Sequence, residues 1–123
     1  MQFLPAIIWF LLSLYLLTLP GTRFPKMTWF DKMQGDKLVH IGMFAVLVTL
    51  LLLPCKSRWQ EVSFWKTALI VAFVALDYGI IMEFVQENFI PNRSFDVGDM
   101  VADGIGSLLP VAYIIYLSKK VVQ

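Results

Sequence analysis

The sequence has little cysteine and little charge. Cys55 is the only cysteine among 123 residues, so the chain can form no intrachain disulfide and no cysteine-ligated metal cluster. Charged residues make up 15% of the chain, against roughly 25% in soluble globular domains. The formal net charge is +1 and no basic block is present to neutralise phosphates, so the sequence predicts no nucleic-acid partner.

Signatures of common enzyme sites are also missing. The sequence contains no glycine-rich phosphate loop, no zinc-binding spacing and no catalytic-triad motif. No side chain can therefore be named as an activated nucleophile, and no cofactor can be assigned. The sequence leaves open whether the protein is an enzyme.

Hydrophobic residues, in contrast, make up 59% of the chain and gather in four stretches. Each is near the length of about 20 residues that an α-helix needs to cross a bilayer. A single strand would leave its backbone unpaired in lipid, so we predict an all-α bundle of four transmembrane helices in one domain, residues 1–123. The first stretch follows no basic segment, so we expect a retained helix and not a cleaved signal peptide. The four stretches are Phe3–Leu19, Leu38–Leu53, Ser63–Val85 and Met100–Leu117.

The connections set the predicted topology. The first, residues 20–37, carries Trp29 and Phe30 beside charges, which is typical of a partly interfacial segment. Four spans place both termini on one side, and the Lys and Arg residues then divide five against five. If neighbouring acids neutralise Lys37 and Arg93, the balance favours cytoplasmic termini in the inner (plasma) membrane.

Charged and polar side chains cluster at the ends of three predicted helices. Charges within membrane spans are costly and indicate function by default. Helical spacing of three or four residues places the members of each group on one face, and span counting places all the groups at the same membrane face. Carboxylates facing lipid would be very unfavourable, so these faces should point toward one another or into a wet cleft. The residues are Asp36, Lys37 and His40, then Glu83, Gln86 and Glu87, then Arg93, Asp96, Asp99 and Asp103.

Structural roles compete with functional ones at several of these positions. Asp96, with an acid three residues later, is typical of a helix N-cap. Gly98, Ala102 and Gly106 form a stripe of small residues that favours close helix packing. By ligand type His40 and the carboxylates could bind a hard divalent cation, but nothing in the spacing requires one, so we predict no metal site.

Two stretches resemble conserved motifs of the VanZ-like family of small bacterial membrane proteins. Residues 35–44, with Lys37 and His40, are similar to its Asp-Lys-x-x-His opening. Residues 83–106 are similar to its second motif, Glu-x-x-Gln, then Arg-x-x-Asp-x-x-Asp, then a helix rich in small residues. The family often has Asn at the position of Asp103, and the additional acid favours a proton or cation role here.

The resemblance implies a multi-pass protein of the bacterial cell envelope, related to proteins of glycopeptide (teicoplanin) resistance. We favour recognition of an anionic lipid headgroup or lipid-linked envelope component at the outer face, with Lys37 and Arg93 as the cations. Three alternatives stay open: an enzyme modifying an envelope lipid, an ion or proton conduit, and a structural subunit. The catalytic candidates are Glu83, His40 and Asp99. The predicted ligand-binding residues are Lys37, His40, Glu83, Gln86, Arg93, Asp96, Asp99 and Asp103.

The predicted topology can be tested with the single cysteine. Cys55 lies in the second connection, on the side of the termini, and should face the cytoplasm. A membrane-impermeant thiol reagent should leave Cys55 unlabelled in intact cells and label it after permeabilisation. Strong labelling in intact cells would reverse the topology.

Overall fold

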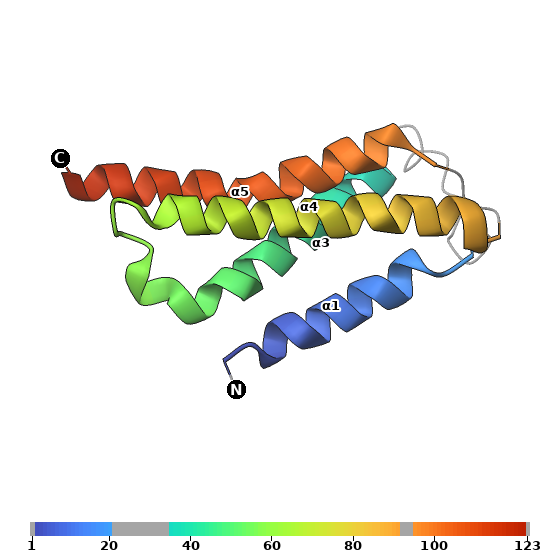
Figure 1. Cartoon of the computed structure of the whole chain (residues 1–123), viewed down its shortest axis with the longest axis horizontal. Helices are drawn as coiled ribbons and strands as arrows, with labels where there is room; N and C mark the ends of the chain where they lie inside the picture. The colour runs from blue at the N-terminus through green and yellow to red at the C-terminus, as the bar shows by residue number, and fades with distance from the viewer. Residues whose placement is uncertain (1, 21–34, 92–94, 123) are drawn as a thin grey trace.

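The computed structural model describes residues 2–20, 35–91 and 95–122, with the backbone alone at residues 35, 36, 121 and 122. These ranges hold four α-helices, one short 3-10 helix and no strand, which confirms the all-α prediction (Figure 1). In chain order the elements are α1 (Leu4–Leu17), α3 (Gly35–Leu52), η2 (Leu53–Arg58), α4 (Phe64–Phe89) and α5 (Val97–Val122).

Local sequence explains where the helices begin and end. Pro5 lies in the first turn of α1, where its missing N–H costs no hydrogen bond. Pro54 cannot continue the hydrogen bonding of α3, and the chain tightens there into η2. The residue before α5 is Asp96, whose carboxylate accepts a hydrogen bond from the Gly98 N–H at 2.8 Å. This capping bond confirms the predicted N-cap.

Three helical segments are long and apolar enough to cross a membrane: Lys37–Arg58, Phe64–Phe89 and Val97–Lys120. The architecture therefore fits a multi-pass membrane protein. The expectation of four spans is met only in part, because α1 has 14 residues. At 1.5 Å per residue, a helix of that length covers about 21 Å of a hydrocarbon core about 30 Å thick.

Small residues let α3, α4 and α5 approach closely. A Cβ atom on Gly106 of α5 would collide with the backbone carbonyl of Ile41 in α3. Ala68, Ala72 and Ala75 line the buried face of α4. The predicted stripe of small residues is thus a packing feature, because at Gly106 the backbones of α3 and α5 are in direct contact.

Below the polar end, the interior is filled by apolar side chains. Phe44, Val48 and Leu52 of α3 meet Phe64 of α4 and Ile114 of α5, and each is at most 1% exposed. Large apolar side chains such as Ile70, Phe73 and Ile81 cover the outside of α4. Such a surface is stable only against lipid or another apolar partner.

Helix α1 is fastened to the other helices by three polar contacts. The Trp9 indole donates a hydrogen bond to the Met43 carbonyl at 2.9 Å, and the hydroxyls of Ser13 and Tyr78 lie 3.0 Å apart. The third contact is made by Gln86, whose side-chain amide donates to the carbonyl of Leu17 at 2.9 Å. Hydrogen bonds of this kind favour helix association where water is excluded.

The ends of four helices gather at one end of the molecule. Figure 1 shows the end of α1, the start of α3, the end of α4 and the start of α5 at its right-hand side. The turn from α3 to α4 and the C-terminus lie at the opposite end. The tertiary structure therefore brings together the three helix ends that carry the predicted polar residues; this end is called the polar end below.

The contact between α3 and α5 can be tested at Gly106. Gly106→Ala should lower the free energy of unfolding by about 1–3 kcal/mol, because the backbone of α3 must move to admit the new methyl group. Gly42→Ala is the matched control in α3, since a Cβ there meets no atom within 4 Å. The free energy is measured by denaturant titration in mixed micelles. Equal stability of the two variants would contradict the close approach.

Candidate functional site

The polar end contains a network of ion pairs that joins α3 to α5. The Lys37 ammonium donates hydrogen bonds to the carboxylates of Asp96 and Asp99, the latter at 2.7 Å. Lys37 lies in the first turn of α3, and both acids lie at the start of α5. The side chain of Asp99 is 10% exposed, so its charge is compensated mainly by its neighbours and little by water.

His40 lies one turn further along α3 and pairs with Asp103. Its Nδ1 is 2.7 Å from Oδ1 of Asp103, and both side chains are buried. A carboxylate accepts hydrogen bonds, so Nδ1–H is the donor and this bond fixes the orientation of the ring. The other ring nitrogen, Nε2, points toward Asp99, with 3.7 Å between Nε2 and Oδ2.

Glu83 completes the cluster from α4. It is 1% exposed, and its Oε2 accepts a hydrogen bond from the backbone N–H of Asp96 at 3.1 Å. In a capping box, an acid inside the helix reaches back to that N–H group. Asp99, at the equivalent position of α5, is occupied by Lys37, and Glu83 supplies the carboxylate from the neighbouring helix instead.

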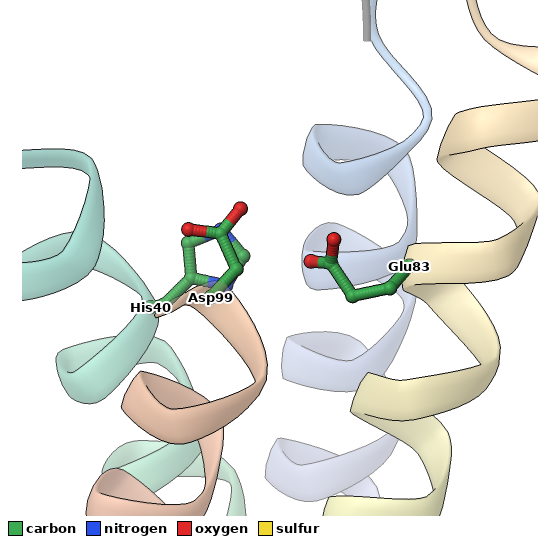
Figure 2. A group of neighbouring side chains, drawn as sticks. All are labelled: His40, Glu83 and Asp99. Carbon is green, nitrogen blue, oxygen red and sulfur yellow. The ribbon is translucent and has the colours of Figure 1, made fainter. Parts of the chain in front are cut away.

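Figure 2 shows how the three side chains meet. The ring of His40 and the carboxylate of Asp99 lie together, and the carboxylate of Glu83 points toward them from α4. One ligand atom from each residue lies within 4.8 Å of the others, and all three residues are buried. The predicted convergence of His40, Glu83 and Asp99 is thus confirmed.

Two glycines make room for this network. A Cβ on Gly79 of α4 would lie 2.6 Å from the Asp103 carboxylate, and a Cβ on Gly98 would lie 2.8 Å from the side chain of Lys37. The sequence analysis missed Gly79. An isolated glycine within an apolar helix was the available signal, since such a glycine often marks a close approach.

Other predicted residues have different positions. Gln86 is 1% exposed, and its amide group holds the end of α1. Asp77 and Glu87 are exposed on α4 and lie outside the cluster. Arg93 and the side chain of Asp36 lie outside the part of the chain that the structure describes.

Asp96 is the cluster acid outside the candidate membrane spans. Its hydrogen bond with Lys37 holds the pKa of its carboxyl group below the usual range. A pKa lowered by folding contributes stability above the unfolded-state pKa, and this contribution is lost as the pH falls through the folded-state value. The pair of Lys37 and Asp96 therefore stabilises the polar end at neutral pH.

The described cluster is acidic. Glu83, Asp96, Asp99 and Asp103 face one lysine, Lys37, and one histidine. Such a set can bind a cation, accept protons or receive hydrogen bonds from hydroxyl and amine groups. Lys37 already contacts two of the carboxylates, so the described side chains offer little positive charge to an anion.

Comparisons with known proteins identify no relative. No family model, no curated protein and no solved structure matches the chain. The geometry of the cluster is therefore the basis for the functional argument.

The link between α3 and α5 can be tested at Lys37. Lys37→Gln should lower the free energy of unfolding by about 1–3 kcal/mol, because it leaves Asp96 and Asp99 without their shared cation. Glu61→Gln is the control, since the pair of Arg58 and Glu61 is about half exposed and should contribute less than about 1 kcal/mol. Denaturant titration in mixed micelles compares the two. A loss no larger than that of the control would show that the network is not needed for stability.

Proposed function

We propose that the protein is a VanZ-like component of the bacterial cell envelope that recognises the polar headgroup of a lipid or lipid-linked precursor. The observation that carries this proposal is the buried polar cluster contributed by three helices at one end of an otherwise apolar bundle. In a bilayer, the end of a spanning bundle lies at the depth of the headgroups. A polar site at that depth is suited to a ligand whose tail stays in the membrane.

The proposal includes four spans in the inner membrane, with cytoplasmic termini and the polar end outside. Helix α1 supports it through its apolar sequence and its exposed side chains such as Ile8 and Leu11. A span shorter than the hydrocarbon core is accommodated by local thinning of the bilayer, at a modest free-energy cost.

The charges of the cluster refine the expected ligand. The carboxylates suit the amine and hydroxyl groups of a headgroup, which donate hydrogen bonds. A phosphate needs positive charge, and Lys37 is already in contact with Asp96 and Asp99. The sequence-based prediction gives that role to Arg93, whose planar guanidinium binds phosphate oxygens in pairs.

A second candidate function is enzymatic modification of the same class of lipid. The observation that favours it is the hydrogen bond between His40 and Asp103, because an acid that orients an imidazole is a recurring arrangement in general acid–base catalysis. Glu83 would be the second proton-transferring group, on the opposite side of the cluster. A proton conduit is less well supported, since Asp77 is exposed while Glu83 and Asp103 are buried.

Lipid retained on purification tests the recognition proposal. Glu83→Gln keeps the shape of the side chain and removes its charge, and should reduce the headgroup-bearing lipid that co-purifies in mild detergent. Asp77→Asn is the matched control, because it removes an acid from the same helix outside the cluster. Native mass spectrometry identifies the lipid and its occupancy in each variant, alongside protein yield.

The outcomes separate the proposals. Loss of lipid in Glu83→Gln alone, with normal yield, supports recognition. Unchanged lipid occupancy and unchanged teicoplanin susceptibility of expressing cells would refute both recognition and catalysis. Turnover of the purified lipid by the native chain would assign the enzymatic function.

A further inference from the structure

The cluster has the composition of a metal site as well as that of a polar contact. His40, Glu83 and Asp99 come from α3, α4 and α5, one residue from each helix. Their exposed fractions are 6%, 1% and 7%, and one ligand atom of each lies within 4.8 Å of the other two (Figure 2). Imidazole nitrogen with two carboxylates is a donor set that binds divalent first-row transition metals.

The orientation of His40 is that of a metal ligand. Its Nδ1–H donates to the buried carboxylate of Asp103, which leaves the lone pair of Nε2 directed at Asp99. Metal-binding histidines are commonly held in this way, with the second ring nitrogen bonded to a carboxylate. Nε2 itself makes no hydrogen bond with the described residues, since its distance to Asp99 is 3.7 Å.

The two carboxylates also keep one oxygen each on the side of the histidine. Asp99 uses Oδ1 for Lys37, and its Oδ2 faces Nε2. Glu83 uses Oε2 for the Asp96 N–H, and its Oε1 has no hydrogen bond from the described residues. Each fully enclosed polar side-chain atom of the described chain has a partner, so Nε2 and Oε1 border space that solvent can reach. An ion therefore has a path to these atoms.

Charge favours a cation at this position. Glu83, Asp96, Asp99 and Asp103 carry four formal negative charges, and Lys37 offsets one of them. Uncompensated charge is costly at a site that is largely removed from water. A divalent cation between the carboxylates would lower this cost.

We propose that His40, Glu83 and Asp99 form a binding site for a divalent transition-metal cation of the Zn²⁺ or Mn²⁺ type. Asp103 is the positioning residue that holds His40 in the ligating tautomer. Mg²⁺ and Ca²⁺ prefer sites made of oxygen atoms, and the imidazole nitrogen disfavours them. Three protein ligands leave at least one coordination position for water or for an oxygen of a headgroup.

Binding requires a small contraction of the cluster. Bonds of about 2.0–2.2 Å place zinc ligands closer together than the 4.8 Å limit of the present arrangement. Glu83 has the longest of the three side chains and makes a single hydrogen bond through one oxygen. It can approach His40 and Asp99 without a movement of the helices.

The first test uses the native chain, because His40 is its single histidine. Purified protein in detergent is treated with EDTA, labelled with ¹⁵N-histidine and titrated with Zn²⁺. The expected spectrum before addition shows a protonated Nδ1 and an unprotonated Nε2, and one equivalent of Zn²⁺ shifts the Nε2 signal most. An imidazolium whose two nitrogen signals do not respond to Zn²⁺ would overturn the proposal.

The second test compares affinities for Zn²⁺ and Mn²⁺ by equilibrium dialysis. Loss of a ligand in His40→Gln, Glu83→Gln or Asp99→Asn should weaken binding by at least about 100-fold, and Asp103→Asn by about 10- to 100-fold. Asp77→Asn and Glu61→Gln are controls outside the cluster and should keep the native affinity. Circular dichroism verifies the helical fold of each variant.

The Co²⁺ complex separates positioning from ligation. Asp103→Asn should bind Co²⁺ more weakly while keeping the visible absorption of a nitrogen- and oxygen-ligated ion, whereas His40→Gln should change that absorption. Native affinity in Glu83→Gln and Asp99→Asn would overturn the site. The metal site does not depend on lipid recognition: a chain that binds Zn²⁺ through His40 and retains no lipid keeps the former and refutes the latter.

Discussion

The cost of burying charge in an apolar bundle is the constraint on which the structure of the polar end depends. Four carboxylates lie at the ends of helices whose outer surfaces are apolar, and each has a partner from another helix. Lys37 links α3 to Asp96 and Asp99, His40 links α3 to Asp103, and Glu83 links α4 to the backbone at the start of α5. Removing one partner exposes another group to the same cost, so the three helices are coupled at this end.

Close helix packing and the polar network depend on each other. Gly106 brings the backbones of α3 and α5 into contact, and Gly79 gives the Asp103 carboxylate its place against α4. Below this level the interior is apolar, with Phe44, Val48 and Ile114 almost fully buried. The apolar packing fixes the helices, and the fixed helices hold the cluster in a geometry that flexible loops would not maintain.

That geometry connects the proposed recognition of a headgroup with the proposed metal site. The described cluster has more negative than positive charge, so a phosphate would not be attracted to it directly. A divalent cation held by His40, Glu83 and Asp99 would reverse this balance and present an open coordination position at the depth of the headgroups. Either occupant, a proton-donating headgroup or a metal ion, uses the same unpaired Nε2 and Oε1 atoms.

Much of the fold could be predicted from the sequence, because a bilayer accepts few structures. Four apolar stretches predicted four helices, the acids at their ends predicted a common polar end, and Asp96 predicted the start of α5. The sequence could not show that α1 ends after 14 residues, nor that Gln86 holds the end of α1 and Asp77 lies exposed. Those facts depend on helix rotation and on contacts between residues far apart in the chain. Only the tertiary structure paired His40 with Asp103 and brought Glu83 to the start of α5, since the spacing along a chain does not determine which faces of separate helices meet.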